Sequence, residues 1–182
     1  MAYTVADNVG VDHPSGTNVP VSTSYPSLSI FSTPSYAYTQ KVGVLIGNGF
    51  NGQEVTSVLN YLQQCGIFID IVSETLGTVT GADGTTIEVN QTFLTTSPYL
   101  LDSIYIVGGS SKNDAKFYQD IMHYINVAYK HYKPIGVATN AQSYIPTSKG
   151  NNLAGVVFAA NNPNFGKEFA ESVAIQRFWN RT

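Results

Sequence analysis

Short apolar runs alternate with segments of helical periodicity from Lys41 to the end of the chain, and this alternation limits the fold more than any other feature. The segments between successive apolar runs are too long for simple hairpins, so the strands must be joined by crossovers and run parallel. A parallel sheet buries both faces and needs helices on each side. The strand-like runs occupy residues 41–47, 67–73, 102–109, 134–138 and 154–160.

Three helices are expected between and after these strands. The first ends near Cys65, a packed thiol followed by Gly66, and the second begins where Ser111 precedes Asp114 by three residues, close to a capping box. Asp83-Gly84 indicates a hairpin. The predicted fold is a flavodoxin-like three-layer sandwich over residues 41–182, with a mostly parallel sheet and helices on both faces. The predicted buried faces of the helices comprise Val55, Val58, Leu59 and Leu62; Tyr118, Ile121, Met122, Ile125, Ala128 and Tyr129; and Phe165, Phe169 and Val173 in residues 164–179.

Residues 1–40 differ in character, being rich in Pro, Ser and Thr without a sustained period. We predict a linker or arm that lies along a surface, which can belong to another domain. Charged residues make up only 12% of the chain against about 25% in ordinary domains, and the net charge is -3. Without a basic patch, nucleic acid is not an expected partner, and without an apolar run of about 18 residues a membrane is not expected either. A single cysteine excludes an internal disulfide.

Ligands of open α/β sheets bind at the carboxyl ends of the strands, near a switch in strand order. Three turn-rich segments, residues 47–54, 108–112 and 139–142, are therefore expected to converge there. A small-ligand pocket at Gly49, Gly109 and Asn140 is one hypothesis for this edge.

Thr139 stands at the strand-to-helix turn where a nucleophile elbow would lie. Its hydroxyl needs a base, and the sequence places no histidine beside it. The alternative is a helix N-cap or an inert turn. Glu54, in the first turn of the first helix, can accept a proton or simply offset the helix dipole.

Two further clusters carry weaker hypotheses. Residues 108–112, Gly-Gly-Ser-Ser-Lys, could bind an anion through backbone amides, but they lack P-loop spacing, and a capped helix start is favoured. His123 and His131 lie eight residues apart and off a common helix face, with Asp120 as a weak third ligand, so no metal site is expected.

Several segments together resemble the C-terminal domain of the large-subunit haem catalases over residues 41–181, and residues 25–40 resemble the connector of those enzymes. That domain is similar in turn to the superfamily of class I glutamine amidotransferases, intracellular proteases and stress chaperones. There, an acid follows the first strand, which Glu54 matches, while Thr139 and Asn140 stand where Cys and His are expected. The resemblance rests on KVGVLIGNGFNG, LGTVTGADGTTIEVNQTF, DSIYIVGG, AYKHYKPIGVA, QRFWNR and YPSLSIFSTPSYAYTQ.

The resemblance implies a non-catalytic accessory domain with a vestigial site at Glu54, Thr139 and Asn140. It implies partners in the catalase core and the sister subunits of a homotetramer, and a chaperone-like capacity toward unfolded client proteins. Haem would belong to the parent core, because Arg177 and Arg181 are the only arginines here and no tyrosine follows them. The alternatives are a stand-alone hydrolase or deglycase of the superfamily and a small-ligand binding module.

Overall fold

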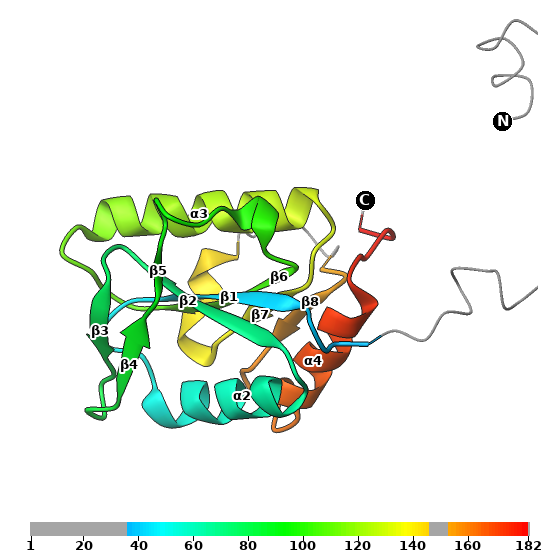
Figure 1. Ribbon diagram of the computed structural model, residues 1–182, viewed down its shortest axis with the longest axis horizontal. Helices are drawn as coiled ribbons and strands as arrows, with labels where there is room; N and C mark the ends of the chain where they lie inside the picture. Colours follow the sequence, from blue (N-terminus) through cyan, green and yellow to red (C-terminus); the bar gives the residue numbers. More distant parts are fainter. Residues whose placement is uncertain (1–35, 146–152, 182) are drawn as a thin grey trace, which may run out of the picture. The chain divides into compact units, whose positions relative to one another are not determined.

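The computed structural model describes residues 36–145 and 153–181, which form a parallel sheet with helices on both faces (Figure 1). Residues 1–35 of the predicted linker lie outside this range. The strand order is β5-β2-β1-β6-β7-β8, and every neighbouring pair is parallel, as predicted. The strands are β1 (Lys41–Ile46), β2 (Phe68–Ser73), β5 (Gln91–Thr92), β6 (Ser103–Gly108), β7 (Ile135–Val137) and β8 (Val156–Phe158).

Helix α3 (Asp114–Lys130) covers one face of the sheet, whereas α2 (Gly52–Gln64) and α4 (Phe165–Ile175) cover the other (Figure 1). Two short 3-10 helices, η3 (Pro98–Leu100) and η4 (Thr139–Tyr144), precede β6 and follow β7. The three-layer, flavodoxin-like architecture predicted from the sequence is therefore confirmed. No helix within residues 36–145 or 153–181 is both long and apolar enough to cross a membrane.

The sheet is buried because its central strands carry apolar residues on both faces. All six residues of β6 are buried. Tyr105 on β6 points toward α4, where its ring packs 5.5 Å from Phe165 and 6.0 Å from Phe169, measured between ring centroids. The predicted alignment of Phe165, Phe169 and Val173 on the buried side of α4 is confirmed.

The buried face predicted for α3 was partly wrong. Tyr118 is about half exposed, and Phe117 and Tyr124 are buried in its place. The 3.6-residue period of the helix allows either Phe117 or its neighbour Tyr118 to lie on the buried face. The Phe93 ring packs edge-on against Phe117 and Tyr124, so these two side chains are buried.

The start of α3 also differs from the prediction. Asn113, rather than Ser111, is the N-cap, and its side chain accepts a hydrogen bond from the backbone N–H of Lys116. Ser111 lies two residues earlier, where its hydroxyl accepts from the N–H of Asn113. Asn is as good a cap as Ser, and Asn113 stands two positions closer to the helix.

The last helix is shorter than predicted. It ends at Ile175, because Gln176 has a φ of 67° and breaks the helical path. The N–H of Phe178 then donates to the carbonyl of Tyr132. Arg177 and Arg181 therefore lie beyond the helix on which the sequence placed them.

The predicted hairpin is present as β3 (Gly77–Thr80) and β4 (Thr86–Val89), which pair antiparallel outside the main sheet. It lies beside the loop that joins β1 to α2. The Asn48 side chain accepts from the N–H of Thr80, and the N–H of Gly49 donates to the Thr80 carbonyl. The hairpin thus supports the loop at the carboxyl edge of the sheet, at the left in Figure 1.

A buried lysine joins η3 to the start of β7. The Lys133 side chain is 3% exposed, and its ammonium group donates to the carbonyls of Pro98, Tyr99 and Leu101 at 2.8, 3.2 and 2.6 Å. Burial lowers the pKa of Lys133, and the positive charge of Arg177 acts in the same direction. The three carbonyls satisfy a cation that has no ion-pair partner within the described residues.

Exposed apolar side chains gather at the opposite, amino edge of the sheet. Because parallel strands all start at this edge, residues just before or at the strand starts lie on it together. We call this set the amino-edge patch. It comprises Tyr36, Tyr38, Phe68, Tyr99 and Leu100, together with Trp179, whose ring packs against Tyr132 shortly before β7.

Candidate functional site

A cavity of about 340 Å³ lies at the carboxyl edge of the sheet. Gly49 after β1, Gly109 after β6 and Asn140 after β7 all line it. The strand order reverses around β1, whose neighbours are β2 and β6, so the cavity occupies the switch point. The convergence of the three turn-rich segments is confirmed.

The loops after β1 and β6 are locked together at the rim. Asn48 and Ser110 exchange two backbone hydrogen bonds, with the N–H of Asn48 2.7 Å from the Ser110 carbonyl and the reverse pair at 2.8 Å. Gly109 makes this close approach possible. Its φ is 115°, and a Cβ placed there would stand 2.6 Å from the carbonyl oxygen of Asn48.

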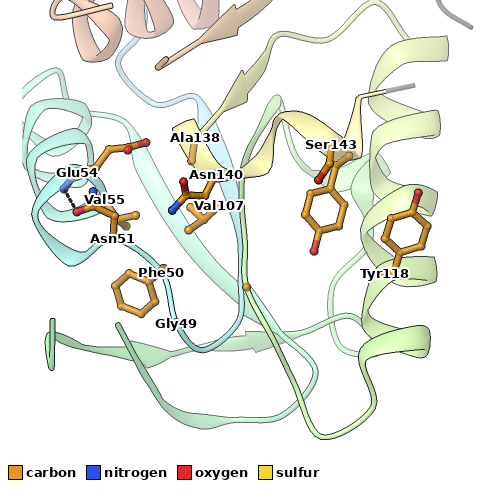
Figure 2. A pocket seen from close by; sticks show the side chains of 12 residues that line it. Gly49, Phe50, Asn51, Glu54, Val55, Val107, Tyr118, Ala138, Asn140 and Ser143 are labelled. Carbon is orange, nitrogen blue, oxygen red and sulfur yellow. Dashed lines mark hydrogen bonds between the residues drawn. The ribbon is translucent and has the colours of Figure 1, made fainter. Parts of the chain in front are cut away.

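Aromatic rings form two sides of the cavity (Figure 2). Phe50 lies on one side and Tyr118 on the other, with Asn140 and Val107 between them. The rings of Tyr118 and Tyr144 stack with centroids 5.5 Å apart. Burial raises the pKa of Tyr144, and the charge of Asp114 adds to this shift. These ring positions were missed from the sequence, where Tyr118 was assigned to the buried face of its helix.

Glu54 connects the first helix to the turn after β7. The N–H of Glu54 donates to the Asn51 side chain, which caps α2 at 3.1 Å. The Glu54 Oε1 atom accepts from the backbone N–H of Thr139 at 3.0 Å. The structure therefore brings Glu54 to Thr139, though through the Thr139 backbone and not through its hydroxyl. Glu54 lines the cavity.

The Tyr105 hydroxyl lies behind this contact in the interior. It is fully buried and lies near the Glu54 carboxylate. Burial raises the pKa of Tyr105, and the nearby negative charge of Glu54 raises it further. The phenol therefore stays protonated, so it offers Glu54 a neutral donor and no positive charge.

Thr139 does not form a nucleophile elbow. Its φ is not positive, it is the first residue of η4, and the N-cap position is held by Ala138. The N-cap interpretation of Thr139 was thus wrong by one residue, because the helix that follows is a 3-10 helix starting at once. Thr139 also lines a second cavity, of about 490 Å³, together with Glu54, whereas Asn140 lines the first.

Within residues 108–112, the amides of Ser110 and Ser111 are already paired, and the N–H of Ser110 donates to the Asn48 carbonyl. The N–H of Ser111 donates to the Asp114 carboxylate, and the Ser111 hydroxyl donates to Glu74. Two carboxylates thus hold the segment, which favours the structural interpretation over anion binding.

The residues of the weak metal hypothesis are not brought together. Asp120 pairs with Lys116, while the His131 ring packs against Tyr99. Across the described part of the chain, no group of three or more His, Cys, Asp or Glu side chains could hold a metal ion. Cys65 follows the last turn of α2 and packs against the core, as predicted.

The cavity residues do not fit a haem group either. The lining contains no histidine, cysteine, methionine or arginine, and its two tyrosines stack on each other. An iron ligand and its supporting cation are therefore both missing from this site.

Comparison with protein families identifies a match over most of the chain. The family described as "C-terminal domain found in long catalases" matches residues 38–182.

Curated relatives match along the full length of the chain. It is 37% identical over 181 residues to "Catalase" of Alkalihalophilus pseudofirmus. It is 39% identical over 190 residues to "Catalase-2" of Bacillus subtilis, and 26% identical over 184 residues to "Catalase HPII" of Pseudomonas aeruginosa. In each case all of this chain is covered, but only 26%, 27% and 26% of the relative. The chain therefore spans about a quarter of the length of these relatives.

Proposed function

The chain belongs to the family of C-terminal domains found in long catalases, and we propose that it serves as a non-catalytic accessory domain of such an enzyme. Hydrogen peroxide decomposition, and the haem it requires, would belong to the core of the longer parent. The domain would stabilise the parent's homotetramer through contacts with the core and sister subunits. Residues 1–40 would form the connector to that core.

The absence of a catalytic constellation supports this proposal. In the part of the chain that the structure describes, the Thr139 hydroxyl has no hydrogen bond to a base, and it does not line the cavity that holds Asn140. A stand-alone hydrolase or deglycase needs an activated nucleophile at a shared site. The accessory role needs only a folded domain and a surface.

The amino-edge patch is the observation that carries the docking role. Exposed apolar clusters on a folded domain mark interaction surfaces. Leu100 is 71% exposed and Trp179 is 73% exposed. Ring contacts involve the aromatic side chains of the patch at Tyr36 and Tyr38, at Tyr99 and at Trp179, whose ring centroid is 5.2 Å from that of Tyr132. Side chains already held by such contacts lose little conformational entropy when they are covered.

The test introduces a charge into the patch of the full-length catalase. We expect Leu100→Asp to raise the tetramer dissociation constant by at least about tenfold, because the buried carboxylate would lose its hydration. Analytical ultracentrifugation over a dilution series measures this change. Leu94→Asp is the matched control, because Leu94 is 86% exposed but follows β5, at the carboxyl edge. Equal assembly of both variants would refute docking through the patch.

We also propose that the domain acts as a chaperone toward unfolded clients. Only 12% of the residues in the chain are charged, and a surface with several exposed tyrosines can make adaptable apolar contacts. We expect the 182-residue chain, at several-fold molar excess, to suppress the light scattering of a heat-denatured client protein. Leu100→Asp should weaken the suppression and Leu94→Asp should not. No suppression by the unaltered chain would contradict the chaperone role.

The cavity at the switch point supports a second candidate function, the binding of a small molecule. Its volume of about 340 Å³ falls in the range of about 300–1,000 Å³ that is usual for small-ligand sites. Aromatic walls beside a few polar groups are also typical of such sites.

A further inference from the structure

The charge of the cavity wall restricts the ligands that it can accept. Glu54 is the one carboxylate among the residues that line this cavity, and the lining includes no lysine or arginine. Glu54 also borders the second cavity, which Lys167 lines, but it takes part in none of the ion pairs formed by the described residues. A half-buried carboxylate without an ion-pair partner attracts cations and repels anions, and it does so more strongly than a carboxylate in open water.

The carboxylate is also fixed in place. Its Oε1 atom is held by the Thr139 N–H, and its backbone is held in the first turn of α2 by the Asn51 cap. The buried hydroxyl of Tyr105 lies near Glu54 but adds no positive charge. A carboxylate held in place without a cationic partner can form charge-assisted hydrogen bonds with an ammonium or amidinium group.

The aromatic walls favour the same class of ligand. Phe50 and Tyr118 flank the cavity on two sides (Figure 2). Tyr144 also lines the cavity, and its ring stacks on that of Tyr118. Aromatic faces attract cations through their quadrupoles and pack against aromatic ligands. Asn140 and Ser143 supply neutral acceptors between them.

We infer that the cavity between β1, β6 and η4 binds a small organic cation in which an ammonium or amidinium group is attached to an aromatic body. This inference rests on the second candidate function, the binding of a small molecule at this cavity. The cationic group lies beside Glu54, and the aromatic body lies between Phe50 and Tyr144.

Two probes of matched shape and opposite charge test the inference with the 182-residue chain. We expect 2-phenylethylamine to bind at least about tenfold more tightly than 3-phenylpropanoate at pH 7, as measured by isothermal titration calorimetry. Glu54→Gln should weaken 2-phenylethylamine binding about tenfold, while its amide oxygen can still accept from the Thr139 N–H. Glu88→Gln is the matched control, because Glu88 is exposed on β4 and lines neither cavity.

A second variant keeps the test independent of any effect of Glu54 on folding. Asn140 is exposed at the cavity, so Asn140→Asp adds a second carboxylate there without disturbing the core. It should tighten 2-phenylethylamine binding several-fold, whereas Asn126→Asp, an equal charge change on the exposed side of α3, should not.

The other possible results would contradict either the small-ligand function or the selectivity for cations. If neither probe binds at millimolar concentration, both the small-ligand function and the inference fail. If the two probes bind equally, or if Glu54→Gln and Asn140→Asp leave the affinities unchanged, the cavity binds small molecules but its selectivity for cations is refuted.

Discussion

Replacing Lys133 with methionine is expected to lower the free energy of unfolding by about 3–5 kcal/mol, because buried carbonyls that lose a charged donor each cost about 1–3 kcal/mol. The ammonium group donates to three carbonyls around η3. Methionine fills a similar volume but donates nothing. Part of this loss of stability is offset, because the substitution also removes a positive charge that is costly to bury.

Urea denaturation followed by circular dichroism measures this change. Lys130→Met is the matched control, since Lys130 is exposed in the last turn of α3 and the same substitution there should cost less than about 1 kcal/mol. If the Lys133 variant unfolds within about 1 kcal/mol of the unaltered chain, water must replace the lysine at the three carbonyls.

Replacing Gly109 with alanine should destabilise the domain by about 3–5 kcal/mol, combining backbone strain with overpacking. The φ of 115° is costly for any residue with a side chain. In addition, the new Cβ would approach the backbone of Gly47 and Asn48, which cannot rotate away as a side chain would. The hydrogen bonds between Asn48 and Ser110 should be lost, and the cavity rim with them.

The same substitution at Gly77 measures the backbone strain without the overpacking. Its φ of 116° is almost the same, but a Cβ there would meet no atom within 4 Å. Gly77→Ala should therefore cost only the strain, about 1–3 kcal/mol. Thermal unfolding of both variants gives the difference, which measures the backbone clash. Equal losses of stability would show that the loops after β1 and β6 can move apart freely.

The sequence predicted those features that depend on period and chain order. Continuous apolar runs such as residues 102–109 indicated buried parallel strands, and the rule for strand-order switches located the cavity before any contact was known. Asp83-Gly84 correctly indicated the hairpin, because φ at Gly84 is positive.

Other features depend on tertiary contacts that no local pattern encodes. Tyr118 and Phe117 are adjacent, and only the position of Phe93 decides which of them is buried. The helix α4 stops at Ile175 because the tail turns to bond with Tyr132, a residue far away in the sequence. Strand β5 has two residues, too few to show a period.

In the candidate site, too, the sequence predicted the position of a residue in its element but not its tertiary contacts. Glu54 was located correctly in the first turn of α2, but its contact is with the backbone N–H of Thr139, which any residue except proline could offer at position 139. Lys133 gave no signal in the sequence, because a lysine before a proline is ordinarily a surface residue. Its burial follows from the carbonyls that η3 directs toward it.

The amino-edge patch and the cavity lie at opposite ends of the same strands. β1 spans six residues, which corresponds to about 20 Å of extended chain. A partner covering the patch would therefore leave the mouth of the cavity unobstructed, and a small molecule in the cavity would not compete with that partner. On the two proposals above, one domain would hold a large partner and a small molecule at the same time.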